Sequence, residues 1–346
     1  MKHVIFITGA TGYIGINLVS KLLRQPNVER IICTTRQKHP DSFRSSIQLN
    51  SKQYGLSVNE FDLKSKIEPI ELDLVKDRSS LLSFLEPYKK TIDIIHHLAS
   101  DIGYGFPVEH FQPWMDVTKI LAEYCMDSKH PKQFHVTGSY GHKLIEFKYT
   151  DEDFYWINGY FVYKKWLHNY MCEKFAKGLK GVLFEPGYVI GSVDPGQKYM
   201  LWRIVRMFAT LEHAFQYRML CTPIDMLIDH YMLALNHTDP GPNIICPFIP
   251  EPLNISKHMQ ELLPHLTMVD FERFREIVKQ RLPKKAKYFG PAMLNCTESV
   301  LSIQKAIFHP LYDSTKYKNI NQTTYLLSCK SFKDALKQGQ QNKDNI

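Results

Sequence analysis

The sequence predicts an α/β protein built on a doubly wound parallel sheet, followed by a smaller, mainly helical C-terminal region. Before Gly191, short apolar stretches with strand character alternate with stretches of helical spacing. This alternation is typical of parallel strands joined by crossover helices. A glycine-rich turn directly follows the first strand. After Gly191 the chain becomes rich in aromatic residues and is punctuated by prolines, and this change predicts the second region.

The first unit of the pattern occupies residues 3–34. His3–Thr8 is apolar and β-branched, residues 9–15 are rich in glycine, and Ile16–Leu23 has helical spacing. Val28–Thr34 then restores a strand pattern. A strand, a tight turn, a helix and a second strand in this order form a βαβ unit with parallel strands.

Later strands extend the sheet, and the connections between them divide the chain. The predicted strands are Ile67–Leu72, Ile92–Leu98, Gln133–Thr137, Gly181–Phe184 and Asn243–Cys246, of which the last is a candidate to return from the second region. The polar connection 37–66, with one predicted helix over Phe43–Tyr54, is expected to be a surface elaboration. We expect one domain over 1–193, a substrate-binding region over 194–336 and a polar tail over 337–346 that stays outside the core.

The composition is that of a globular protein, with 44% hydrophobic and 23% charged residues. No apolar run reaches the roughly 20 residues of a membrane span. The strand pattern begins too near Met1 to leave room for a secretory leader, so a cytoplasmic location is expected. The seven cysteines are scattered without a CxxC pair, which predicts reduced core residues and no metal site.

The net charge of +8 suits anionic ligands as well as nucleic acid. The densest basic cluster consists of Lys279, Arg281, Lys284, Lys285 and Lys287. No nucleic-acid motif accompanies it, so no nucleic-acid partner is expected. The cluster is interpreted either as a solvated face or as a docking patch for an acidic partner.

Three glycines in the segment TGATGYIG, residues 8–15, indicate a dinucleotide site. Gly9 permits the tight turn, Gly12 lets backbone N–H groups approach a pyrophosphate, and Gly15 lets the helix pack closely on the sheet. Their position between a strand and a helix gives the motif its weight and predicts a Rossmann fold. The predicted contacts are Gly9, Thr11, Gly12, Tyr13, Ile14 and Gly15.

The second strand ends in Thr34-Thr35-Arg36, without the acidic residue that would hydrogen-bond the adenosine ribose of NAD. An arginine there suits the 2′-phosphate of NADP. We therefore expect NADP rather than NAD, the alternative being that Arg36 is one more exposed cation.

Tyr160 and Lys164 lie one helical turn apart, so both side chains project from one face of a helix. A tyrosine donates a proton to a carbonyl oxygen that receives hydride, and a neighbouring ammonium stabilises the phenolate that results. The strand that ends at Thr137-Gly138-Ser139 places hydroxyls at the edge where open parallel sheets bind ligands. Either Ser139 or Thr137 is expected to hydrogen-bond the substrate oxygen, unless the hydroxyl caps the following loop.

In chain order, five segments resemble the extended short-chain dehydrogenase/reductases. They are residues 8–15, Leu72-Asp73-Leu74, His97-Leu98-Ala99-Ser100, Ser139 with Tyr160 and Lys164, and residues 186–191, PGYVIG. The resemblance implies that Ser139, Tyr160 and Lys164 are catalytic. It also implies that Asp73 and Leu74 contact the adenine of the cofactor and that Leu98 and Ala99 contact the adenosine ribose. Pro186, Tyr188 and Val189 would flank the nicotinamide. The remaining implied cofactor contacts are Thr137, Tyr160 and Lys164.

Within the superfamily, residues 3–265 are most similar to the thioester reductase and fatty acyl-CoA reductase branch. The similarity lies in the insertion with Gln53-Tyr54-Gly55-Leu56, in Trp166 and in residues 221–225, CTPID. Three departures are present, of which one is the short stretch between Ser139 and Tyr160 together with the faint similarity beyond about residue 265. Trp166 lies one position later than in the branch pattern. Pro113, Trp114 and Asp116 stand where the superfamily keeps an asparagine and a glycine–threonine pair, so an altered proton relay is expected.

Three functions compete at this point. The first is an NADPH-dependent reductase of a carbonyl or acyl thioester, whose substrate is a small molecule or is bound to a carrier; the basic cluster over 279–287 would then meet CoA or an acidic carrier protein. The second is a nucleotide-sugar epimerase or dehydratase with tightly held NAD. The third is a non-catalytic dinucleotide-sensing protein.

Overall fold

The computed structural model describes residues 2–103, 106–126, 129–130, 132–146, 159–191, 200–236, 243–249, 251–281, 310–313, 315 and 329–341. Its centre is a seven-stranded sheet of order β11-β6-β5-β4-β1-β2-β3, in which every neighbouring pair is parallel. The strands are β1 His3–Thr8, β2 Val28–Thr35, β3 Ile67–Glu71, β4 Ile94–His97, β5 Gln133–Thr137, β6 Lys180–Phe184 and β11 Ile244–Ile245. The predicted doubly wound Rossmann sheet is confirmed, and the strand near 243–246 does return to it.

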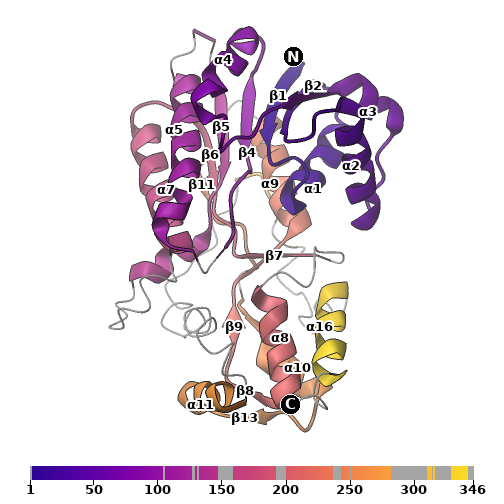
Figure 1. The fold of residues 1–346 in the computed structure, drawn as a ribbon, viewed down its shortest axis with the longest axis vertical. Helices are drawn as coiled ribbons and strands as arrows, with labels where there is room; N and C mark the ends of the chain where they lie inside the picture. Colours follow the sequence, from indigo (N-terminus) through magenta and orange to yellow (C-terminus); the bar gives the residue numbers. More distant parts are fainter. Residues whose placement is uncertain are drawn as a thin grey trace.

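Helices cover both faces of the sheet (Figure 1). One face packs against α1 Tyr13–Leu22, α2 Pro40–Gln53 and α9 Ile224–Asn236, and the other against α4 Leu81–Leu85, α5 Gln112–Met126 and α7 Gly159–Ala176. Short 3₁₀ segments, η3 Val108–Phe111 and η4 Tyr140–Glu146, pack against α7. Because strands such as β1 are buried on both faces, their sequences are continuously apolar rather than alternating.

A second, mainly helical lobe has its own hydrophobic core, beyond the sheet in Figure 1. Its helices are α8 Met200–Leu211, α10 Ile255–Leu262, α11 Phe271–Arg281 and α16 Lys330–Gln341. The short pairs β7 Tyr188–Ile190 with β10 Cys221–Pro223, β8 His213–Ala214 with β13 Thr267–Met268, and β9 Arg218–Met219 with β12 Leu253–Asn254 complete it. None of the described helices is both long and apolar enough to cross a membrane.

The connection 37–66 differs from its prediction. It contains two helices, α2 and α3 Glu60–Lys66, and α2 buries Phe43 and Ile47 in the core. The predicted helix over Phe43–Tyr54 is confirmed as α2, where apolar side chains spaced four residues apart give an otherwise polar, largely exposed helix one buried stripe.

The polar tail also differs from its prediction over residues 337–341, which continue α16. Phe332 and Ala335 of α16 are buried, and Arg206 of α8 donates to the Gln338 side chain at 3.0 Å. The exclusion of these residues from the fold was wrong. They form the polar last turn of the helix that begins at Lys330, and the apolar first turns of the same helix are buried. Residues 342–346 lie outside the described residues.

Candidate functional site

The glycine-rich turn between β1 and α1 is built around two close approaches. Gly9 has φ +76°, and a Cβ there would lie 2.8 Å from the backbone nitrogen of Ala99. A Cβ on Gly15 would lie 2.1 Å from the carbonyl oxygen of Gly9. Both positions therefore require glycine, one for the left-handed turn and one for contact between the helix and the turn.

Gly12 is different, because it is exposed and a Cβ there would meet only the Gly9 carbonyl oxygen, at 3.3 Å. It is the N-cap of α1, where no side chain caps the helix and the first turn holds no acidic residue. The backbone N–H groups at a helix start lack intrahelical partners and attract anions. The turn therefore fits the pyrophosphate of a dinucleotide.

The neighbouring strand β4 supports this turn. Thr8 Oγ1 lies 2.7 Å from His97 Nδ1 and accepts a hydrogen bond from the Ala99 backbone at 3.2 Å. The segment with Leu98 and Ala99 is thus brought against the glycine turn.

Arg36 and Asp73 lie farther along the same edge of the sheet. Thr35 pairs with Glu71 in the β2–β3 register, so Arg36 lies beside the start of the segment that contains Asp73 and the buried Leu74. The Asp73 carboxylate accepts from the backbone of Val75 and Lys76 and so caps its own turn. Arg36 is exposed, and no described residue forms an ion pair with it.

On α7, Tyr160 and Lys164 are both buried, and the Lys164 Nζ lies 5.5 Å from the centre of the Tyr160 ring. This ammonium donates to the carbonyl oxygen of Thr137 at 3.2 Å. Burial lowers the pKa of Lys164 to about 7, and the negative charge of Glu185 acts against that shift. The two helical residues therefore meet the end of β5, as the sequence predicts.

The loop after β5 holds Ser139 against the segment that follows β6. The Gly138 backbone donates to Phe184 O at 2.7 Å, and the Tyr140 backbone donates to Pro186 O at 3.1 Å. Ser139 Oγ accepts from the Gly141 backbone at 3.1 Å, so this hydroxyl does cap the following loop. Its proton remains available for a second hydrogen bond.

The other candidate hydroxyl has a different partner. Thr137 Oγ1 lies 2.6 Å from the hydroxyl of Tyr231 on α9. Since Tyr231 is fully buried, this contact directs the Thr137 hydroxyl toward the interior. Of the two, Ser139 is therefore the better placed to meet a ligand at the edge of the sheet.

The region of the expected altered proton relay contains hydroxyls that the sequence analysis did not single out. Thr118 Oγ1 lies 3.1 Å from His97 Nε2 and donates to the carbonyl of Trp114. Tyr163 is hydrogen-bonded to Ser100 and Thr118, and burial raises its pKa to about 12. The Asp116 carboxylate forms ion pairs with Arg78 at 3.7 Å and with Lys119 at 3.9 Å.

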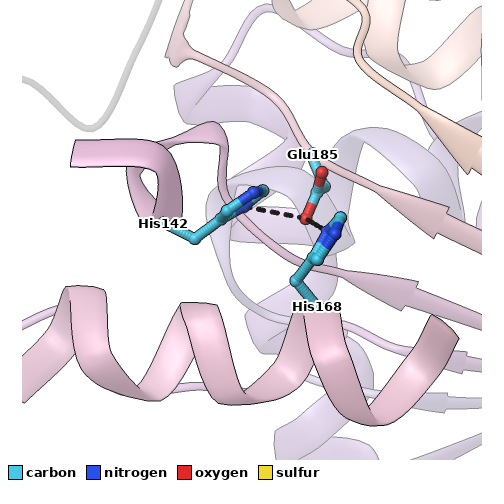
Figure 2. A group of neighbouring side chains, drawn as sticks. All are labelled: His142, His168 and Glu185. Atoms are coloured by element: carbon cyan, nitrogen blue, oxygen red, sulfur yellow. Dashed lines mark hydrogen bonds and ion pairs between the residues drawn. The ribbon is translucent and has the colours of Figure 1, made fainter. Parts of the chain in front are cut away.

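Three buried or half-buried side chains beside this edge were missed by sequence reasoning (Figure 2). The Oε1 of Glu185 lies 3.0 Å from His142 Nδ1 and 2.9 Å from His168 Nδ1. Burial opposes ionisation of Glu185, but the N–H donors of the two histidines outweigh it and hold its pKa below the ordinary value. Two signals were present in the sequence: His168 lies four residues after Lys164, and Glu185 directly precedes PGYVIG.

Comparison with known proteins places the chain in a family. The family model described as male sterility protein matches residues 7–231, more than half of the chain. The aldehyde reductase lnaA of Aspergillus flavus is 31% identical over 114 residues, which are 32% of this chain and 10% of that protein. The chain spans only 5% of the length of the first curated relative that it matches.

Two solved structures share the fold over nearly all of the chain. The terminal R domain from the myxalamid PKS-NRPS biosynthetic pathway has a TM-score of 0.69 at 17% identity, covering 99% of this chain and 90% of that one. A thiolation-reductase di-domain from an archaeal non-ribosomal peptide synthetase has a TM-score of 0.67 at 14% identity, covering 100% and 75%. At these identities the likeness concerns the fold.

Proposed function

The chain belongs to the male sterility protein family of NAD(P)-binding oxidoreductases with the extended short-chain dehydrogenase/reductase fold, and from this premise we propose that it is an NADPH-dependent reductase of a carbonyl or an acyl thioester. The observation that carries the proposal is the meeting of α7 with the end of β5, where the Lys164 Nζ reaches the Thr137 carbonyl beside Ser139. This edge also holds the glycine turn, so a dinucleotide and a substrate oxygen would lie next to each other.

In this proposal each residue has one task. When bound, the nicotinamide supplies a hydride to the substrate carbon. Tyr160 donates its phenolic proton to the substrate oxygen, Lys164 stabilises the phenolate, and the Ser139 hydroxyl orients the oxygen. The glycine turn binds the pyrophosphate, Leu98 and Ala99 line the adenosine ribose, Asp73 and Leu74 border the adenine, and Pro186, Tyr188 and Val189 flank the nicotinamide.

The preference for NADPH is proposed from Arg36. It is exposed at the end of β2, where the sequence Thr34-Thr35-Arg36 offers a cation and no carboxylate. A guanidinium forms strong, charge-assisted hydrogen bonds with a phosphate.

A carrier-bound or CoA-bound acyl group is the substrate class that we propose. The support comes from the similarity to a thiolation-reductase di-domain and to an aldehyde reductase. The region 194–336 would hold this substrate. Lys279 and Arg281 lie in the last turn of α11, where they would meet an acidic carrier; Lys284, Lys285 and Lys287 lie outside the described residues.

The proposal is tested by following NADPH oxidation with acyl-CoAs, acyl carrier protein thioesters and aldehydes. Tyr160→Phe is expected to lower single-turnover rates by about two to four orders of magnitude, the scale of a positioned acid, with nearly unchanged NADPH affinity. Phe161→Leu, a change at a neighbouring ring, is the matched control for packing. Wild-type rates in Tyr160→Phe would reject the assignment. Epimerisation of a nucleotide sugar with retained NAD would replace the proposal with that activity.

A further inference from the structure

The histidine–glutamate cluster in Figure 2 joins three segments: η4, which follows Ser139; α7, which carries Tyr160 and Lys164; and the turn after β6. His142 lies on η4, three residues after Ser139; His168 lies on α7, one turn after Lys164; Glu185 follows β6 and precedes Pro186. We propose that Glu185 is a positioning residue that fixes the Ser139 loop against α7 and supplies a negative charge that favours the ammonium form of Lys164. The inference rests on the proposed function, because it assigns Glu185 a role toward those groups.

The first support is the hydrogen bonding of the cluster. His142 Nδ1 lies 3.0 Å from Glu185 Oε1 and 3.0 Å from the carbonyl oxygen of Ser139. His142 therefore links the Ser139 loop to the carboxylate. His168 Nδ1 links α7 to the same oxygen at 2.9 Å, and Cys172 Sγ lies 3.6 Å from His168 Nε2.

The second support is charge. The groups that face Lys164 are the rings of Tyr160 and Tyr163 on α7, the Thr137 carbonyl, His97 on β4 and Glu185. Among these described groups Glu185 is the anion. His97 stays neutral, because burial lowers its pKa to about 3. Glu185 itself contacts the two histidines and the thiol of Cys246, whose pKa burial raises to about 12.

A glutamate with two histidines is also a set of ligands that zinc uses. Here the two imidazole rings stack, with centroids 4.2 Å apart and planes at 29°. Both Nδ1 atoms converge on Glu185 Oε1 at hydrogen-bond distance. The carboxylate oxygen thus occupies the place where an ion would bind, and hydrogen bonding accounts for the cluster.

The test compares Glu185→Gln with Glu173→Gln, which makes the same change on the exposed side of α7. NADPH affinity and single-turnover rate are measured between about pH 6 and 9, a range that brackets the titration of a buried lysine. Deprotonation of Lys164 is expected to lower the NADPH affinity and the single-turnover rate. In Glu185→Gln this decrease is expected about one pH unit lower than in wild type, and both quantities are expected to be roughly tenfold lower than in wild type above the new midpoint. Glu173→Gln is expected to keep the wild-type profile, and a Glu185→Gln profile that overlays wild type would overturn the counter-charge role.

Hydrogen exchange of the backbone amides of residues 138–142 tests the positioning role without any cofactor. We expect faster exchange in Glu185→Gln than in Glu173→Gln, and equal exchange would overturn this role. If Glu185→Gln does not fold, His168→Leu removes one donor at a partly exposed position and is expected to speed the same exchange while keeping the pH profile.

Two further results are decisive. Stoichiometric zinc in the purified wild-type protein would overturn the inference in favour of a metal site. Wild-type protein that binds neither NADPH nor NADH would refute the proposed function, and the exchange measurement would then still decide whether Glu185 positions the loop.

Discussion

Lys164 is proposed to stabilise the phenolate of Tyr160, but the burial of its charge destabilises the ligand-free fold. Burial lowers its pKa from 10.5 to about 7. Between these pH values the unfolded chain binds a proton that the folded chain does not, so the free energy of unfolding increases as the pH rises from about 7 toward 10.5. Below about pH 7 the buried charge has its full unfavourable effect.

Lys164→Met is therefore expected to raise the free energy of unfolding near neutral pH, by on the order of 1–4 kcal/mol, and to flatten its pH dependence above pH 7. Urea denaturation at a series of pH values measures both effects. Lys177→Met, at an exposed lysine in the turn directly after α7, is the control and is expected to change neither. A Lys164→Met protein less stable than wild type at neutral pH would contradict the reasoning. The same variant is expected to lose turnover.

The proposed role of Arg36 is to bind the 2′-phosphate of NADPH. Arg36→Asp is expected to weaken NADPH binding at least about tenfold more than NADH binding, because it removes a charge-assisted contact and adds repulsion. Titration calorimetry with both dinucleotides checks this. Lys38→Asp makes the same change in charge two residues away, also at an exposed position, and is expected to affect the two cofactors nearly equally. Equal weakening by Arg36→Asp would show that Arg36 is simply an exposed cation.

At the scale of elements, the glycine turn contains one residue proposed for cofactor binding, Gly12, and one that the packing of α1 requires, Gly15. Gly12→Val places a branched side chain where the pyrophosphate would lie. Gly12 is exposed, and its Cβ would lie 3.3 Å from the Gly9 carbonyl oxygen, a tight contact that a shift of a few tenths of an ångström relieves, so we expect a folded protein without dinucleotide affinity. Gly15→Ala would bring a Cβ to 2.1 Å from the Gly9 carbonyl oxygen, so we expect a lower melting temperature. Thermal melts and fluorescence titration with NADPH distinguish the two. Retained affinity in Gly12→Val would show that the turn is only structural.

The elements that the sequence predicted are those with a strong local pattern. β1, β2 and β5 are apolar runs between turns, and the glycine spacing and the Tyr160–Lys164 pair are short-range signals that needed no tertiary information. α3 was missed because Leu63 is its one buried residue and Phe61 is exposed, which leaves no apolar period. The cluster of His142, His168 and Glu185 was missed because its members come from three elements, and only folding brings them together.

At the scale of the whole molecule, α16 completes the core of the second lobe. Phe332 is fully buried and packs edge-on against Trp202 of α8, with ring centres 6.1 Å apart. Phe332→Ala is expected to lower the free energy of unfolding by about 3–5 kcal/mol through loss of burial and formation of a cavity. Chemical denaturation measures the change, and Lys333→Ala, at the next and exposed position, is expected to stay within about 0.5 kcal/mol of wild type.

The return of the chain to the sheet at β11 affects how the chain folds during translation. β6 ends at Phe184, but its outer partner β11 begins at Ile244, and the intervening residues supply much of the second lobe and all of α9. A nascent chain that has emerged only to residue 193 presents β6 as an unpaired edge, an arrangement that invites association with other chains. The sheet gains its last strand only after residue 245 has emerged, when α8 of the second lobe has already been synthesised and α10, α11 and α16 are still to come.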